Sequence, residues 1–145
     1  LNNIGSIYHS WGQYQKALEY CEKVVAISQK IGDVGAESIL VGNKAALYAA
    51  LGKYDQAIKT AKESLAIKEK IGVPVKGIKD SIANYYLDAG NTVKAEPLIN
   101  ETKYNSTLGR LALIKSDYPS AQRYYENDMK WAEKEIQLVT RGFWV

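Results

Sequence analysis

The chain has 145 residues, of which 46% are hydrophobic and 24% charged, and this composition excludes a disordered or fibrous protein. Its 19 basic and 16 acidic side chains are interspersed, so the net charge of +3 gives little reason to expect a nucleic acid partner. No apolar run approaches the ~20 residues of a membrane span, and one cysteine cannot form an internal disulfide. No targeting segment is visible, so a cytoplasmic location is the default expectation. Because the chain begins at Leu1, we expect it to be a fragment of a larger protein.

The sequence repeats itself along its length. Residues 12–18, GQYQKAL, return as residues 52–58, GKYDQAI, after a shift of 40 positions. A weaker third copy contains Tyr86, Gly90 and Ala95, and a fourth contains Leu108-Gly109 and Ala121. We therefore expect one array of four units, approximately 1–33, 34–73, 74–104 and 105–140, with a short tail at 141–145.

Within each unit, apolar residues recur at spacings of three and four, which predicts two α-helices per unit and no strands. Gly12, Gly52 and Gly90 lie where a first helix must end, and Ser116-Asp117 takes that place in the fourth unit. The predicted helices are 1–11, 14–31, 34–51, 54–71, 75–89, 93–103, 106–115 and 118–140.

The helix predicted at 93–103 contains an irregularity. Thr92 is the expected N-cap of this helix. Pro97 lacks the N–H that a helix interior uses, so we expect it either to delay the start of the helix or to kink it.

The small residues of the repeats carry a resemblance to a known family. A small residue lies in the first helix of every unit (Gly5, Ala45, Ala83 and Gly109), and an alanine lies in every second helix (Ala17, Ala57, Ala95 and Ala121). With the Gly-x-Tyr of residues 12–14 and 52–54, this pattern resembles the tetratricopeptide repeat (TPR) family. The 40-residue unit is similar to its bacterial regulator and kinesin-light-chain branches. The resemblance implies an all-α, right-handed superhelical solenoid of four antiparallel helix pairs. Lys44 departs from the family pattern, which usually has an apolar residue there.

The sequence offers little for catalysis. His9 and Cys21 could in principle form a nucleophilic pair, but Cys21 has the spacing of a small core residue. The inventory cannot fill a conventional zinc site, and no glycine-rich phosphate-binding loop is present. We expect no enzyme activity and no cofactor.

The resemblance implies that first helices line a concave groove, which would bind a peptide or a helix of another protein. The side chains expected to face that groove are Asn2, Asn3, Ser6, His9, Asn43, Ala46, Ala50, Asn84, Asp88 and Arg110. An asparagine amide can both donate to and accept from a peptide backbone. The same amide could instead satisfy its own helix, and the sequence leaves both interpretations open.

Two further functions remain open on the sequence. The array could be a structural segment that self-associates, because its last helix carries more apolar residues than one neighbour would cover, and terminal repeats without a polar cap expose apolar surface. Alternatively, it could be the regulatory repeat region of a protein whose catalytic domain lies elsewhere.

Overall fold

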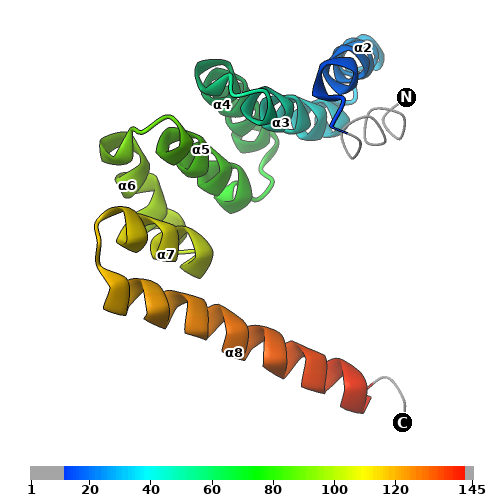
Figure 1. Cartoon of the computed structure of the whole chain (residues 1–145). Coiled ribbons are helices and arrows are strands. Elements are labelled where there is room, and N and C mark those ends of the chain that lie inside the picture. Colours follow the sequence, from blue (N-terminus) through cyan, green and yellow to red (C-terminus); the bar gives the residue numbers. More distant parts are fainter. Residues whose placement is uncertain (1–11, 143–145) are drawn as a thin grey trace. The chain divides into compact units, whose positions relative to one another are not determined.

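The computed structural model describes residues 12–142, and Figure 1 shows that this part of the chain is built from helices. The described range contains seven helices and no strand, which confirms the predicted all-α class. The helices are α2 (Tyr14–Ile31), α3 (Val34–Ala50), α4 (Tyr54–Ile71), α5 (Lys76–Asp88), α6 (Thr92–Thr102), α7 (Asn105–Ile114) and α8 (Tyr118–Gly142). The helix predicted at 1–11 lies outside the described residues.

The helices begin and end close to the positions that the sequence predicts. The predicted ranges 14–31 and 54–71 coincide with α2 and α4, and the other five differ by no more than two residues at either end. Both coincident helices stop at a glycine with φ of +73°, Gly32 and Gly72. The next backbone N–H then donates back to the last turn, from Asp33 to the Ser28 carbonyl at 2.9 Å in α2. Glycine reaches this left-handed conformation without a steric cost, so it fixes the end of the helix.

The expected equivalence of Ser116 with the turn glycines is confirmed. Gly12, Gly52 and Gly90 have φ between +72° and +77°, and Ser116 has φ of +58°. The N–H of Asp117 donates to the Ala112 carbonyl at 2.8 Å, as the N–H of Lys53 does to that of Tyr48 at 2.9 Å. The fourth unit therefore makes the same turn with a serine, for which this left-handed conformation is sterically unfavourable.

For α6, the expected N-cap is wrong, and so is one of the two expected effects of Pro97, a delayed start; the alternative, a kink, stays a prediction. The cap is Asn91 rather than Thr92, because the Asn91 side-chain oxygen accepts a hydrogen bond from the Lys94 N–H at 3.1 Å. The helix also begins at Thr92 and continues through Pro97, so the proline does not delay its start. Val93, whose carbonyl would have accepted from position 97, is 83% exposed, so water can satisfy that oxygen.

The chain divides into two compact units, Leu1–Leu98 and Ile99–Val145. In the first unit, α3 packs against both α2 and α4. Ala17, Leu18 and Cys21 of α2 form a core cluster with Leu47 of α3. On the α4 side, the hydroxyl of the fully buried Ser64 donates to the Ser38 carbonyl at 2.7 Å. Within the first unit, α3 is therefore packed on two flanks, by α2 and by α4.

In the second unit, α7 packs against α8. The contact is close at Gly109, where an added Cβ would lie 2.8 Å from Cζ of Tyr125. Ala121 is 2% exposed in the same unit, and the mid-repeat alanines Ala17, Ala57 and Ala95 are at most 1% exposed. The alanine that recurs in each second helix is therefore buried in all four units.

Candidate functional site

Within the described part of the chain, one face of α3 carries exposed side chains along most of the helix. Ile39, Asn43, Ala46 and Ala50 are all exposed, and their spacings of four, three and four place them on one side of the helix. We call these four residues the α3 stripe. Three of them were predicted to face a ligand, and the structure leaves all three accessible. Their role in binding stays a prediction.

The other predicted site residues differ in their surroundings. Asn84 is half-buried in α5, and its amide donates to the Asp80 carbonyl at 3.1 Å and to the Asp80 carboxylate at 3.2 Å. The Asn84 amide therefore forms these hydrogen bonds within its own helix, which was one of the two interpretations of such an asparagine. Asp88 is exposed at the end of α5, and burial, with a smaller effect from Asp88, raises the pKa of Tyr85. Arg110 is half-buried in the second unit. Asn2, Asn3, Ser6 and His9 lie outside the described residues.

A cavity of about 600 Å³ opens on the other side of α3, between α2 and α4. We call it the α2–α4 cavity. On α3 it is lined by Glu37, Val41 and Lys44, which share the face opposite the α3 stripe at 3.6 residues per turn. The remaining lining comes from α2 and α4: Glu22, Val25, Ala26, Gln29, Thr60, Glu63, Ala66 and Ile67.

Four of the polar side chains at this cavity are paired with one another. The Lys44 ammonium lies 3.1 Å from the Glu22 carboxylate and 5.8 Å from the centre of the Tyr48 ring. The Gln29 amide donates to the Glu37 carboxylate at 2.8 Å. These contacts explain why the fold tolerates a lysine where the family pattern has an apolar residue: its side chain lines the α2–α4 cavity and its charge is paired with Glu22.

The Glu22–Lys44 pair should make stability depend on alkaline pH. Burial alone would lower the pKa of Lys44, but the hydrogen bond and charge of Glu22, with Tyr48 and Cys21, outweigh it and raise that pKa. The stabilisation is thus complete below the ordinary lysine pKa and is lost as pH rises through the higher folded value. Because both side chains are partly exposed, we expect a coupling energy of about 0.2–1 kcal/mol near pH 7.

This coupling can be measured by a double-mutant cycle with Glu22→Gln and Lys44→Met in urea denaturation. The coupling should be favourable at neutral pH and should fall towards zero as pH rises through the raised pKa of Lys44. A coupling that is zero at neutral pH, or that persists undiminished in alkali, would contradict this assignment.

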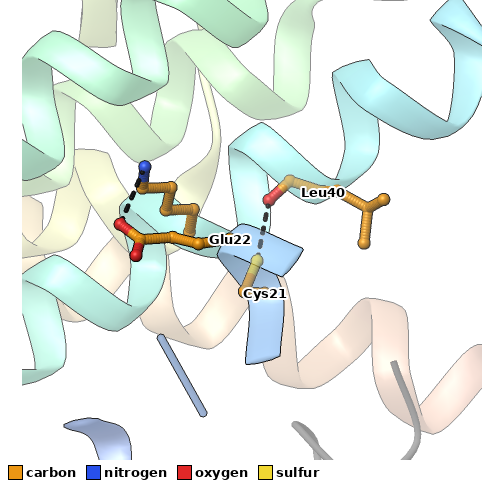
Figure 2. Close-up of polar contacts among 4 residues, drawn as sticks. Cys21, Glu22 and Leu40 are labelled. Atoms are coloured by element: carbon orange, nitrogen blue, oxygen red, sulfur yellow. Dashed lines mark hydrogen bonds and ion pairs between the residues drawn. The ribbon is translucent and has the colours of Figure 1, made fainter. Parts of the chain in front are cut away.

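Cys21 is a core residue, as its spacing predicted. It is 8% exposed, and its thiol donates to the Leu40 carbonyl at 3.3 Å, as Figure 2 shows beside Glu22. Burial, only partly offset by the charge of Lys44, raises the pKa of the thiol. The thiol is therefore kept from its nucleophilic thiolate form. The other member of the possible pair, His9, lies outside the described residues.

The described residues were also searched for a metal site and for a helix that could span a membrane. Between residues 12 and 142, no three His, Cys, Asp or Glu side chains are grouped so that they could hold a metal ion. Over the same range, every helix is too short or too polar to cross a membrane.

The α2–α4 cavity was missed by the sequence reasoning. Glutamates at helical spacing usually belong to a solvated helix face, so those of the cavity gave no signal in the sequence. The signal that could have found it was Lys44 at an apolar position, together with Ala26 and Ala66, which are 40 residues apart and both exposed.

A family model described as a tetratricopeptide repeat matches residues 1–70. A search of curated protein sequences finds no match.

Solved structures agree with this match. The TPR domain of Arabidopsis FLU is 20% identical with a TM-score of 0.66, and the match covers 70% of this chain and 87% of that one. BtubC from P. vanneervenii is 16% identical with a TM-score of 0.73, and the match covers 97% of this chain and 63% of BtubC. A Podosopora anserina protein with nearly identical TPR-like repeats, whose name refers to kinesin light chain, is 18% identical with a TM-score of 0.66 over 97% of this chain and 74% of that one. At these identities the likeness shows the fold, a solenoid of TPR-like helical repeats.

Proposed function

We propose, from the membership of residues 1–70 in the tetratricopeptide repeat family, that this chain is a non-catalytic module that binds a peptide or helix of another protein. Repeats of this family generally mediate protein–protein interaction. The observation that carries the proposal here is the α3 stripe, which is exposed along a helix whose two flanks are already packed.

The chemistry of the α3 stripe suits an extended or helical ligand. Ala46 and Ala50 carry only a methyl group, so a ligand can approach the α3 backbone closely. Asn43, between Ile39 and Ala46, offers two donors and an acceptor, which can pair with a peptide backbone whatever its side chains. Ile39 is 56% exposed and adds an apolar contact at one end. Polar atoms that fix orientation beside small and apolar residues are typical of binding sites.

The proposal is tested with a peptide selected by display on the full chain. We expect Asn43→Ala together with Asn3→Ala to weaken binding by about 2- to 10-fold per asparagine, since a net hydrogen bond contributes about 0.5–1.5 kcal/mol. Ala46→Trp should block the α3 stripe and abolish binding. Affinities are measured by calorimetry, with circular dichroism to confirm the fold.

Asn127→Ala provides the matched control, because Asn127 is an exposed asparagine on α8, outside both the α3 stripe and the α2–α4 cavity. Its affinity should equal that of the parent chain. A selected peptide that binds the Asn43 and Ala46 variants as well as it binds the parent would remove the α3 stripe from the site.

Self-association is the second candidate function, and α8 favours it. This helix has 25 residues, and Ala121 is its buried residue. Five large side chains beyond its first turns are between 52% and 66% exposed: Met129, Trp131, Ile136, Leu138 and Val139. Contact with a second copy of this chain would remove these apolar side chains from water.

Light scattering at micromolar concentration tests this candidate. We expect the parent chain to exceed the monomer mass, and Ile136→Lys with Val139→Lys to return it to monomer. Removal of residues 141–145 shows whether the tail takes part. A monomer for the parent chain at every concentration would exclude self-association through α8.

A further inference from the structure

The α2–α4 cavity is separate from the α3 stripe, and its lining has a different chemistry. We propose that this cavity is a second docking site, for a segment of a partner protein that carries an aliphatic side chain next to a lysine or arginine. The inference does not depend on peptide binding by the α3 stripe.

The interior of the cavity suits an aliphatic side chain. Val25, Val41 and Ile67 supply apolar surface from three different helices. A volume of about 600 Å³ falls in the usual range for ligand sites and exceeds what a single water-filled gap between helices requires. Burial of an aliphatic side chain there would remove apolar surface from water on both partners.

The borders of the cavity allow a backbone to come close. Ala26 on α2 and Ala66 on α4 are both exposed and both line the cavity. They occupy equivalent positions of the 40-residue repeat, so each side of the opening ends in a methyl group. Larger side chains at either position would keep a partner's backbone away from the apolar interior.

The charge of the lining selects a cationic ligand. Three carboxylates, those of Glu22, Glu37 and Glu63, line the cavity with one ammonium, that of Lys44. Lys44 is already paired with Glu22 at 3.1 Å. Gln29 holds Glu37 through a hydrogen bond of 2.8 Å without neutralising it. Negative charge therefore remains at Glu37 and Glu63, which attracts lysine or arginine and repels acidic segments and nucleic acid.

Three synthetic peptides separate the apolar contribution from the charge. The probes are a short peptide of alternating lysine and leucine, its glutamate–leucine counterpart and its lysine–serine counterpart. Binding to the full chain is followed by NMR shifts of isotope-labelled methyl groups. We expect the lysine–leucine peptide to shift the methyl signals of Val25, Val41 and Ile67, and to leave Ile39 on the α3 stripe unchanged. The other two peptides should shift none of them at the same concentration.

Variants then assign the binding to the cavity. Glu37→Gln with Glu63→Gln should weaken the lysine–leucine peptide by about 2- to 10-fold, the range expected for two partly exposed ion pairs. Glu19→Gln with Glu69→Gln is the matched control, because these glutamates are exposed on α2 and α4 away from the cavity. Ala66→Trp should abolish binding by filling the cavity, whereas Ala46→Trp should leave it unchanged.

The outcomes distinguish this proposal from the function assigned to the α3 stripe. Loss of binding in Ala66→Trp but not in Ala46→Trp supports the second site, whether or not the displayed peptide binds the stripe. Equal loss in both variants, or a shift of Ile39 instead of Val41, would overturn it. Cavity methyl signals that move with protein concentration alone would assign the cavity to a second copy of this chain and would also overturn it.

Discussion

Replacing Ile82 with alanine is expected to lower the free energy of unfolding by about 2–5 kcal/mol, the usual cost of truncating a fully buried isoleucine. Ile82 lies in α5 and is 1% exposed, among the largest side chains of the described residues that are completely enclosed. Its removal takes apolar surface out of the core and leaves a cavity that rigid helices close only in part. Urea denaturation followed by circular dichroism measures the change.

Ile31→Ala is the control for this variant. Ile31 is 70% exposed at the end of α2, so the same chemical change there should alter the free energy of unfolding by no more than about 0.5 kcal/mol. If the two variants had equal effects, α5 would not be part of the cooperatively folded core.

The helices of this protein could be predicted because their ends are encoded locally. Gly32 and Gly72 end α2 and α4 through a left-handed residue, and Gly52 makes the turn between α3 and α4. Such signals act within one or two turns of chain and need no knowledge of packing. The error in α6 has the same origin: Asn91 and Thr92 are adjacent and both are good caps, and only the backbone geometry decides between them.

Binding surfaces were less accessible to the same reasoning, because they depend on which helix faces remain uncovered. The exposure of Asn43, Ala46 and Ala50 could be anticipated from the family resemblance, which implies where first helices lie. That Asn84 would instead bond to Asp80 depends on the rotamer chosen in the folded helix. Residues of similar position in the repeat thus have different surroundings.

The α2–α4 cavity could not be predicted from the sequence at all. Its lining residues come from three helices, and their spacing along each helix is that of an ordinary solvated face. Only the separation of α2 and α4 across α3 turns these faces into a cavity. Lys44 was visible as an exception in the sequence, but its pairing with Glu22 requires the packing of α2 on α3.

Because both mid-repeat alanines are buried, Ala17→Leu and Ala57→Leu are each expected to lower the free energy of unfolding by about 1–3 kcal/mol through overpacking. Ala57 is 0% exposed in α4, and Ala17 is 1% exposed in α2, where it belongs to the cluster with Leu47 of α3. Three additional carbon atoms have no space at either position. The helices must therefore separate or the side chains must leave their preferred rotamers.

Ala26→Leu and Ala66→Leu are the matched controls, because they make the same change on the exposed faces of the same two helices. Alanine and leucine have similar helix propensities, so these controls should shift the free energy of unfolding by no more than about 0.5 kcal/mol. Urea midpoints of the four variants give the comparison directly. If the buried and exposed substitutions destabilised equally, helix propensity rather than close packing would explain the alanines. If only the buried pair destabilised, the alanines would be the residues that set the distances between α2, α3 and α4, and with them the width of the cavity that these helices enclose.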